Sequence, residues 1–297
     1  PERQSAVQGG SMADIKFQLF RVRVEFPQQR SLLTTEMKPA QVLAKAIKER
    51  PAAELRLGHI WHIGNVAKLD KTGLYFALGR TTKTVLEHYD DETGDFVEQE
   101  FEFAPFTHVL VDTDLGLCAI AHKTRLSTTI HGIAKKLGDL LMESKVAQAQ
   151  EASFRILSID DPRKFIKLIK SAHAVSYISM TFHRPNPVDV EKLIRKPLGK
   201  YLQEADGEKG AIQIRGDHLD QAALAEVARS AVAEGDEAKA KIQTVKSAKP
   251  MMRYSKGTPV TVRKDAANTK KQRQSLLSKI RGIYKRIRGE SGWKSEV

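Results

Sequence analysis

Residues 107–121 read Thr-His-Val-Leu-Val-Asp-Thr-Asp-Leu-Gly-Leu-Cys-Ala-Ile-Ala. Two apolar runs are separated by five residues, Asp112 to Gly116, which include two Asp and a Gly, residues that favour a tight turn. Such a short connection joins antiparallel neighbours, because a parallel crossover needs a dozen residues or more. The stretch therefore predicts a β-hairpin within an antiparallel sheet.

The same pattern of short strands and turn-rich links continues toward the N-terminus. Further strands are expected at Leu55–Val66, Gly73–Arg80, Thr84–Tyr89 and Phe96–Phe103. Earlier still, residues 15–26 alternate apolar and polar side chains with one slip, which predicts a half-buried strand with a bulge. Helices expected to begin at Pro39 and near Ser127 complete a strand-rich α+β domain over residues 12–150.

The second half of the chain predicts another α+β domain, over residues 151–297. Strands are expected at Phe154–Ile159, Ala174–Phe182 and Ala211–Arg215, and a helix capped by Asp217 and ended by Gly235. Next, Lys239 and Lys241 alternate with apolar residues, as on a protected sheet edge or a face laid against phosphate. Residues 258–263 are expected to pair beside them. The fold class is thus α+β, with two domains of mostly antiparallel sheet packed with helices and a basic C-terminal amphipathic helix.

The positive charge of the chain is concentrated in its last fifth. The whole chain has a formal net charge of +13, and residues 241–297 alone contain 16 Lys and Arg against 3 Asp and Glu. The preceding residues are therefore neutral as a group. A segregated basic region is typical of a protein that binds a polyanion.

Composition argues against several classes of protein. The single cysteine, Cys118, cannot build a disulfide framework or a multi-cysteine zinc site, and its apolar neighbours predict that it is buried. No apolar run reaches the ~18 residues of a membrane helix, and no Walker sequence or nucleophile elbow is present. Residues 1–11 are polar and patternless, which we interpret as an expression scar. We expect a cytoplasmic protein without a cofactor.

The C-terminal helix, expected over residues 270–288, carries the clearest functional signal. At helical spacing, its apolar residues form one stripe: Leu276, Leu277, Ile280, Ile283, Tyr284 and Ile287. Its cations occupy the other side, and no Asp or Glu lies between Lys270 and Arg288 to pair with them along the helix. One face is therefore expected to dock on protein while the other faces phosphate.

A shorter helix, expected over residues 161–170, repeats this arrangement and would extend the basic surface. The expected phosphate contacts are Arg163, Lys164, Lys167, Lys170, Arg253, Lys256, Arg263, Lys264, Lys271, Lys279, Arg281, Lys285, Arg286 and Arg288. Few aromatic residues are interleaved with these cations, and single-stranded nucleic acid is usually bound by stacking on aromatic rings. Duplex DNA bound through its backbone is therefore the favoured ligand.

Two other functions stay open at this point. A basic amphipathic helix can also lie on an anionic membrane or in an acidic groove of a membrane-protein partner. Asp112 and Asp114, followed by Lys123, could belong to a magnesium-dependent nuclease, although two aspartates in a tight hairpin turn explain the pair more simply. No other group of residues suggests catalysis.

The order of these segments resembles the RexA/KwaB-like family of bacterial antiphage DNA-binding proteins. The resemblance rests on residues 73–80, on residues 106–112, on Cys118–Ala121, on the helix start at Ser127 and on residues 181–187. It implies a two-domain α+β protein, dimeric, that binds duplex DNA without sequence preference in antiphage defence, alongside a second defence-system protein. It implies no catalytic residue, and the region after Lys270 lies outside it.

Overall fold

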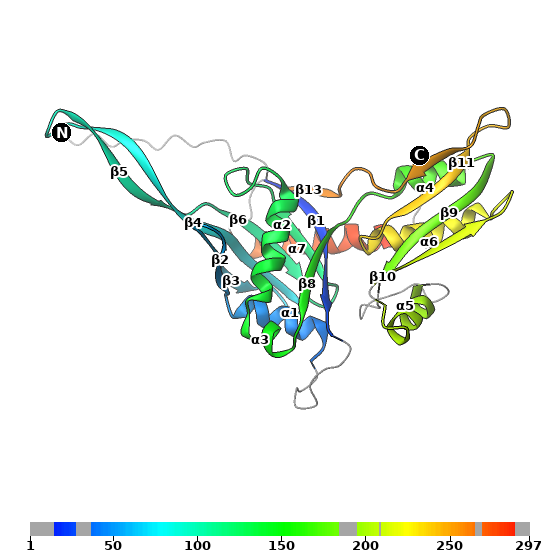
Figure 1. Cartoon of the computed structure of the whole chain (residues 1–297), viewed down its shortest axis with the longest axis horizontal. Helices are drawn as coiled ribbons and strands as arrows, with labels where there is room; N and C mark the ends of the chain where they lie inside the picture. Colours follow the sequence, from blue (N-terminus) through cyan, green and yellow to red (C-terminus); the bar gives the residue numbers. More distant parts are fainter. Residues whose placement is uncertain (1–14, 28–36, 184–194, 208, 265–268, 289–297) are drawn as a thin grey trace.

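A computed structural model describes residues 15–27, 37–183, 195–207, 209–264 and 269–288, and the segment 1–11 lies outside these ranges. The described chain is α+β, with two antiparallel sheets and seven helices (Figure 1). The strands are β1 (Ile15–Glu25), β2 (Ala52–Arg56), β3 (His59–Lys68), β4 (Gly73–Asp90), β5 (Asp95–Phe103), β6 (Phe106–Asp112), β7 (Leu117–Ala121), β8 (Ser153–Ser158), β9 (Ala174–His183), β10 (Lys209–Arg215), β11 (Ala238–Gln243), β12 (Met251–Tyr254) and β13 (Thr261–Lys264). The helices are α1 (Pro39–Lys48), α2 (Ile130–Met142), α3 (Lys145–Ala149), α4 (Arg163–Lys170), α5 (Arg195–Glu204), α6 (Gln221–Ala233) and α7 (Lys270–Arg288).

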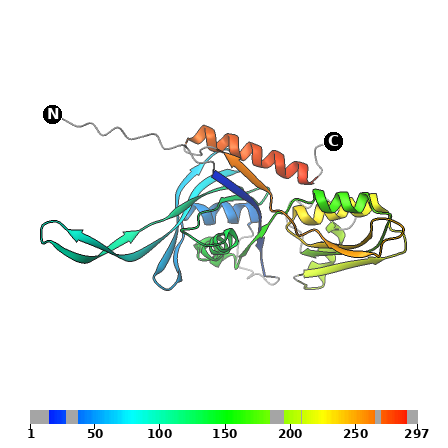
Figure 2. The same ribbon diagram turned by 90° about the horizontal axis from the view of Figure 1, so that it is seen from above.

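The first sheet has nine strands, with the main order β13-β1-β7-β6-β4-β3-β2. The hairpin predicted from residues 107–121 is confirmed, since β6 pairs antiparallel with β7. In its second half β4 leaves the sheet and pairs only with β5, from Thr82 opposite Phe103 to Asp90 opposite Asp95. Figures 1 and 2 show this two-stranded ribbon extending well beyond the body of the molecule.

Both faces of the first sheet are covered. Helices α1, α2 and α3 pack on one face, where Phe20, Phe76 and Ile120 are fully buried. Helix α7 lies along the other face, over Phe17 and Leu19 (Figure 2). The half-buried strand expected at residues 15–26 is therefore buried on both sides, because a helix from the far end of the chain covers its second face.

The second sheet is an insertion into the edge of the first. After β8, which pairs with β1 over Phe20–Glu25, the chain leaves the first sheet. It returns as β13, which pairs with β1 over Ile15–Gln18. A bridge between Asp160 and Pro259 closes the base of the insertion. Three elements that follow residue 150, β8, β13 and α7, thus belong to the first sheet or pack on it.

The second sheet has the order β10-β9-β11-β12, with α4 and α6 on one face. The prediction that residues 258–263 pair beside β11 is wrong. β12 pairs with β11 instead, and β13 pairs with β1. β11 is accordingly an interior strand and not an edge. The cap of α6 is Asp220 instead of Asp217, and Gly235 ends the turn after the helix with a φ of +77°.

Candidate nucleic-acid interface

A groove runs between the insertion and the C-terminal helix. It has a volume of about 960 Å³ and is lined by α4, the middle of α6, the segment that leads into β13 and the last turns of α7. Apolar side chains, among them Ile166, Val260 and Ile283, form part of its lining. Five cations also line it: Arg163, Lys167, Lys170, Arg229 and Arg286. We call this set of residues the basic groove.

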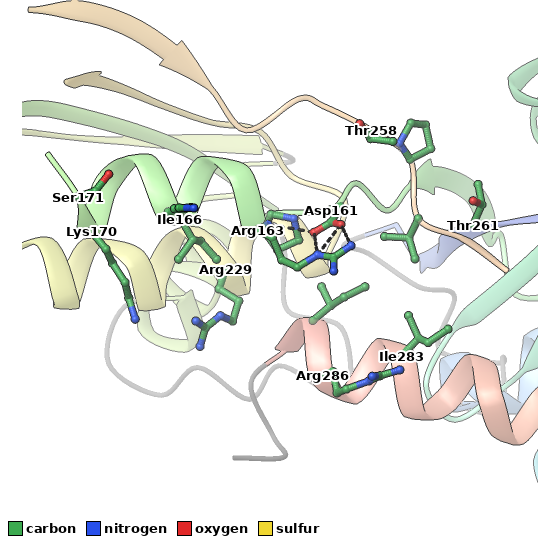
Figure 3. Close-up of a pocket in the computed structure, with 15 residues that line it drawn as sticks. Asp161, Arg163, Ile166, Lys170, Ser171, Arg229, Thr258, Thr261, Ile283 and Arg286 are labelled. Carbon is green, nitrogen blue, oxygen red and sulfur yellow. Dashed lines mark hydrogen bonds and ion pairs between the residues drawn. The ribbon is translucent and has the colours of Figure 1, made fainter. Parts of the chain in front are cut away.

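One carboxylate, Asp161, lines the groove beside these cations (Figure 3). It accepts hydrogen bonds from the backbone N–H of Arg163 at 3.0 Å and from its Nε at 2.7 Å. Burial opposes ionisation, but these bonds outweigh it and lower the pKa of Asp161. Arg163 is therefore already paired, and the cations that the described groove offers to a ligand are Lys167, Lys170, Arg229 and Arg286.

These four cations come from three helices that the insertion brings together. Lys167 and Lys170 are exposed on α4, whose buried side carries Phe165, Ile166 and Ile169. Arg229 is half-buried on α6, and Arg286 is exposed on α7. Figure 3 shows Lys170, Arg229 and Arg286 lining the same pocket from their three helices. Four positive charges above an apolar surface suit a ligand with several negative groups.

Helix α7 docks on the first sheet through the predicted stripe. Five of the six expected residues are buried, and Ile283 is half-buried at the groove. Lys271, Lys279, Lys285 and Arg286 are exposed, as the amphipathic pattern predicts. Since Lys164 is also exposed, the basic surface extends past the groove along α4 and α7.

Two cations of α7 differ from their predicted role. Arg281 and Arg288 lie at the borders of the apolar stripe, and their guanidinium groups pair with carboxylates of other elements instead of facing solvent. Nη2 of Arg288 lies 3.9 Å from Oε1 of Glu234, and the two side chains are 5% and 3% exposed respectively. Arg281 donates from Nε to Oδ2 of Asp112 at 2.5 Å and from Nη1 to Oδ2 of Asp70 at 2.6 Å. Both guanidinium groups are therefore engaged in contacts within the fold.

The Arg281 contacts fix α7 to the turns of the first sheet. Asp70 also accepts hydrogen bonds from the backbone N–H groups of Thr72 and Gly73, at 3.0 and 2.7 Å. The hydrogen bond from Arg281, with smaller contributions from these N–H groups, lowers the pKa of Asp70 to about 2. The ionised form of Asp70 is therefore the one that the folded chain stabilises.

Acidification should loosen this contact. The pKa of Asp70 in the folded chain, about 2, lies below its ordinary value of 3.8, so its stabilisation is present above about pH 4 and is lost as the pH falls toward 2. We expect the thermal unfolding midpoint to fall more steeply over this range in the wild-type chain than in an Asp70→Asn variant. Equal slopes in the two proteins would contradict this assignment.

The remaining predicted cations are spread over other surfaces. Arg253 lies on β12 opposite Ala240, on the face that the helices cover. Lys256 forms an exposed ion pair with Glu237 at 3.4 Å. Arg263 is exposed on β13, at the edge of the first sheet. Lys264 belongs to the same strand, but its side chain is outside the described residues. The structure therefore does not gather all fourteen cations on one face.

The open face of the second sheet carries Lys239 and Lys241, whose alternation is compatible with a face laid against phosphate, together with Arg215, which sequence reasoning missed. Arg215, Tyr177, Lys241 and Met252 are successive cross-strand neighbours on β10, β9, β11 and β12. Lys239 lies opposite Tyr254, which is 64% exposed. The alternation of lysines along β11 was the only feature of the sequence that indicated this face. It does not reveal that tyrosines of other strands lie on the same face. Arg229 was missed because nothing near it on α6 is basic.

The two aspartates considered for a nuclease differ in their surroundings. Asp112 is 2% exposed; besides Arg281, it accepts hydrogen bonds from Thr72 Oγ1 at 3.0 Å and from the N–H of Leu115 at 2.9 Å. Asp114 is exposed in the turn. In the described ranges, no three His, Cys, Asp or Glu residues gather as a metal site. The bond from Leu115 is that of a turn residue, and the bond from Arg281 joins this turn to α7.

Cys118 is fully buried in the first sheet, as its sequence context predicts, and burial raises the pKa of its thiol. Among the described helices, none is both long enough and apolar enough to cross a membrane.

Comparison of the chain with models of known protein families and with curated proteins found no match.

Proposed function

We propose that this protein binds the phosphate backbone of duplex DNA through the basic groove, without reading the base sequence. The observation that carries the proposal is the convergence of Lys167, Lys170, Arg229 and Arg286 from three helices on one groove. Each phosphate that a Lys or Arg neutralises releases condensed counterions, and this release drives affinity that does not depend on sequence.

The lining of the groove favours duplex over single-stranded nucleic acid. Its described lining residues include no Phe, Tyr or Trp, so it offers no ring on which an unpaired base could stack. Exposed cations on two of the same helices, Lys164 on α4 and Lys285 on α7, add to the surface along which a backbone could lie. An extended set of positive charges is sufficient to contact a row of phosphates without reading the bases.

The resemblance to RexA/KwaB-like proteins supplies the biological part of the proposal. In it, the protein acts in the bacterial cytoplasm in antiphage defence, with a second defence-system protein as a partner. Docking of the basic surface on an anionic membrane is the alternative that the same charges support. A nuclease is disfavoured, because Asp112 is committed to Arg281 and to its own turn.

The test is the affinity for a duplex of arbitrary sequence over a salt series. We expect a steep decrease of affinity with salt in the wild-type chain. Replacing Lys167, Lys170, Arg229 and Arg286 with alanine should reduce the slope of log affinity against log salt by about 3.6, from ~0.9 per phosphate contact, and weaken binding at least ~10-fold. Truncation before α7 is a poor substitute, because α7 covers one core of the first sheet.

The matched control removes four charges from a different surface. Lys209, Arg215, Lys239 and Lys241 are exposed on the second sheet, and their replacement with alanine should leave the slope unchanged. An equal loss in this control would move the interface to the open sheet face. Negligible duplex binding at low salt, or tighter binding to anionic vesicles than to duplex, would overturn the proposal.

A further inference from the structure

Among the described strands, the ribbon that leaves the first sheet pairs with no other, and Arg125 contacts it only at its base, over the ring of Phe103. We call residues 82–103, the distal half of β4 with β5, the arm. Its β4 residues from Thr82 to Asp90 pair only with β5, and a ribbon of this length is about 30 Å long. An isolated two-stranded ribbon is marginally stable in water, because it has no core. A protruding arm of this kind therefore favours a surface that covers it.

The arm is strongly acidic in a basic protein. It contains eight Asp and Glu residues and one lysine, so its net charge is −7, whereas the whole chain has +13. Glu87 lies directly opposite Glu98 in the register of the ribbon. Like charges in this position destabilise a strand pair, and a cationic partner would relieve that repulsion.

One face of the arm combines this charge with aromatic rings. Cross-strand pairing places Glu87 with Glu98 and Tyr89 with Phe96 on the same face, near the tip. The two rings pack edge to face with centroids 5.2 Å apart, yet Tyr89 is 50% exposed and Phe96 is 82% exposed. Aromatic side chains in this setting are typical anchors of protein interfaces.

The basic groove is complementary to this face. It has apolar lining residues that could receive the Tyr89–Phe96 pair, with Lys167, Lys170 and Arg286 beside them for the carboxylates. Figures 1 and 2 both show the arm and the inserted sheet at opposite ends of the molecule. The arm therefore points away from the groove of its own chain, and contact between them requires a second copy.

We infer that the arm of one copy docks in the basic groove of a second copy of this chain. Two copies placed side by side in opposite directions bring each arm to the groove of the other, so both contacts form under one two-fold axis and the assembly closes. The contact rests on the shape and charge of the groove and not on its proposed nucleic-acid ligand. Duplex DNA and the arm would then compete for the same cations.

A charge exchange between two variants tests the contact. An arm variant carries Glu87→Lys, Glu98→Lys and Glu102→Lys, and a groove variant carries Lys167→Glu, Lys170→Glu and Arg286→Glu; all six positions are exposed. Light scattering on nucleic-acid-free protein at low salt should give twice the mass of one chain for wild type and a single-chain mass for each variant. An equal mixture of the two variants should recover the double mass, because each arm again faces an oppositely charged groove.

Several outcomes would overturn the inference. They are a single-chain mass for wild type, a double mass that persists in both variants, and a mixture that stays at single-chain mass although both variants give wild-type circular dichroism. If either triple variant does not fold, Phe96→Ala replaces it, since this side chain is almost wholly exposed. Phe96→Ala should weaken self-association at least ~10-fold, and unchanged association would overturn the inference.

The same proteins separate this inference from the proposed function. The arm variant keeps the groove intact, so it should bind duplex DNA at least as tightly as wild type. Loss of the double mass with normal DNA binding supports both proposals. A double mass that obeys the charge exchange, without any DNA binding, would leave the arm contact standing and remove the proposed function.

Discussion

Replacing Glu234 with alanine should lower the free energy of unfolding by about 3–5 kcal/mol, because it leaves a buried charge without its partner. Glu234 follows α6 and is 3% exposed. Its Oε2 accepts a hydrogen bond from Nε of Arg21 at 2.7 Å, and Arg21, on β1, is 1% exposed. This ion pair joins the inserted unit to the first sheet.

The third element at this junction is α7. The hydroxyl of Tyr284 donates to Oε1 of Glu234 at 3.4 Å. Burial, followed by the Glu234 carboxylate, raises the pKa of Tyr284 to about 12. A parallel contact joins Arg23 of β1 to Asp236 at 2.9 Å. Glu234 therefore holds β1, α6 and α7 together, and its loss should be felt in all three.

Urea unfolding is the measurement, with Glu237→Ala as the matched control. Glu237 lies three residues further along the chain and pairs with Lys256, but both side chains are at least 70% exposed. An exposed pair of this kind contributes little, so the control should change the free energy of unfolding by no more than about 1 kcal/mol. Equal losses in the two variants would show that the burial of Glu234 is not what makes it important.

The second large effect is expected from Arg281→Ala, at about 2–4 kcal/mol. Removing the guanidinium leaves Asp112, whose side chain is 3% exposed, without its cation. The effect should be smaller than for Glu234→Ala, because Arg281 is 23% exposed and Asp70 is 38% exposed. Solvent already screens part of this second pair.

Two further substitutions make this prediction specific. Arg281→Lys should recover only part of the loss, since an ammonium cannot donate to two carboxylates in the fixed geometry of a guanidinium. Lys279→Ala, at an exposed position of the same helix, should be close to neutral. Full recovery by lysine would mean that charge alone, and not the bonds from Nε and Nη1, holds α7 in place.

Local pattern was sufficient to predict the fold class and many of the elements, but not α3, β12 or the turn that divides residues 55–66 between β2 and β3. The apolar runs at residues 107–111 and 117–121 became β6 and β7, and the stripe from Leu276 to Ile287 became the buried side of α7. These features depend on spacing within one segment, which periodicity reports directly. The sequence also predicts two strands in the arm, but not that they leave the sheet.

What could not be predicted depends on partners far along the chain. The helical pattern places Arg281 and Arg288 beside the apolar stripe, but it does not reveal that Asp112 and Glu234 will lie next to them. The groove has the same origin: α6 contributes Arg229 only because the insertion folds back beside α7. Likewise, the pairing of β13 with β1 joins residues about as far apart as the described chain allows.

That pairing has a consequence for the synthesis of the protein. Of the described elements, β1 leaves the ribosome first, whereas β13 and α7, which complete its edge and cover Phe17 and Leu19, leave last. Until then the nascent chain presents an apolar sheet face and an unpaired strand edge, both of which favour aggregation. Slow closure of such distant contacts makes this period the one in which the chain depends most on chaperones.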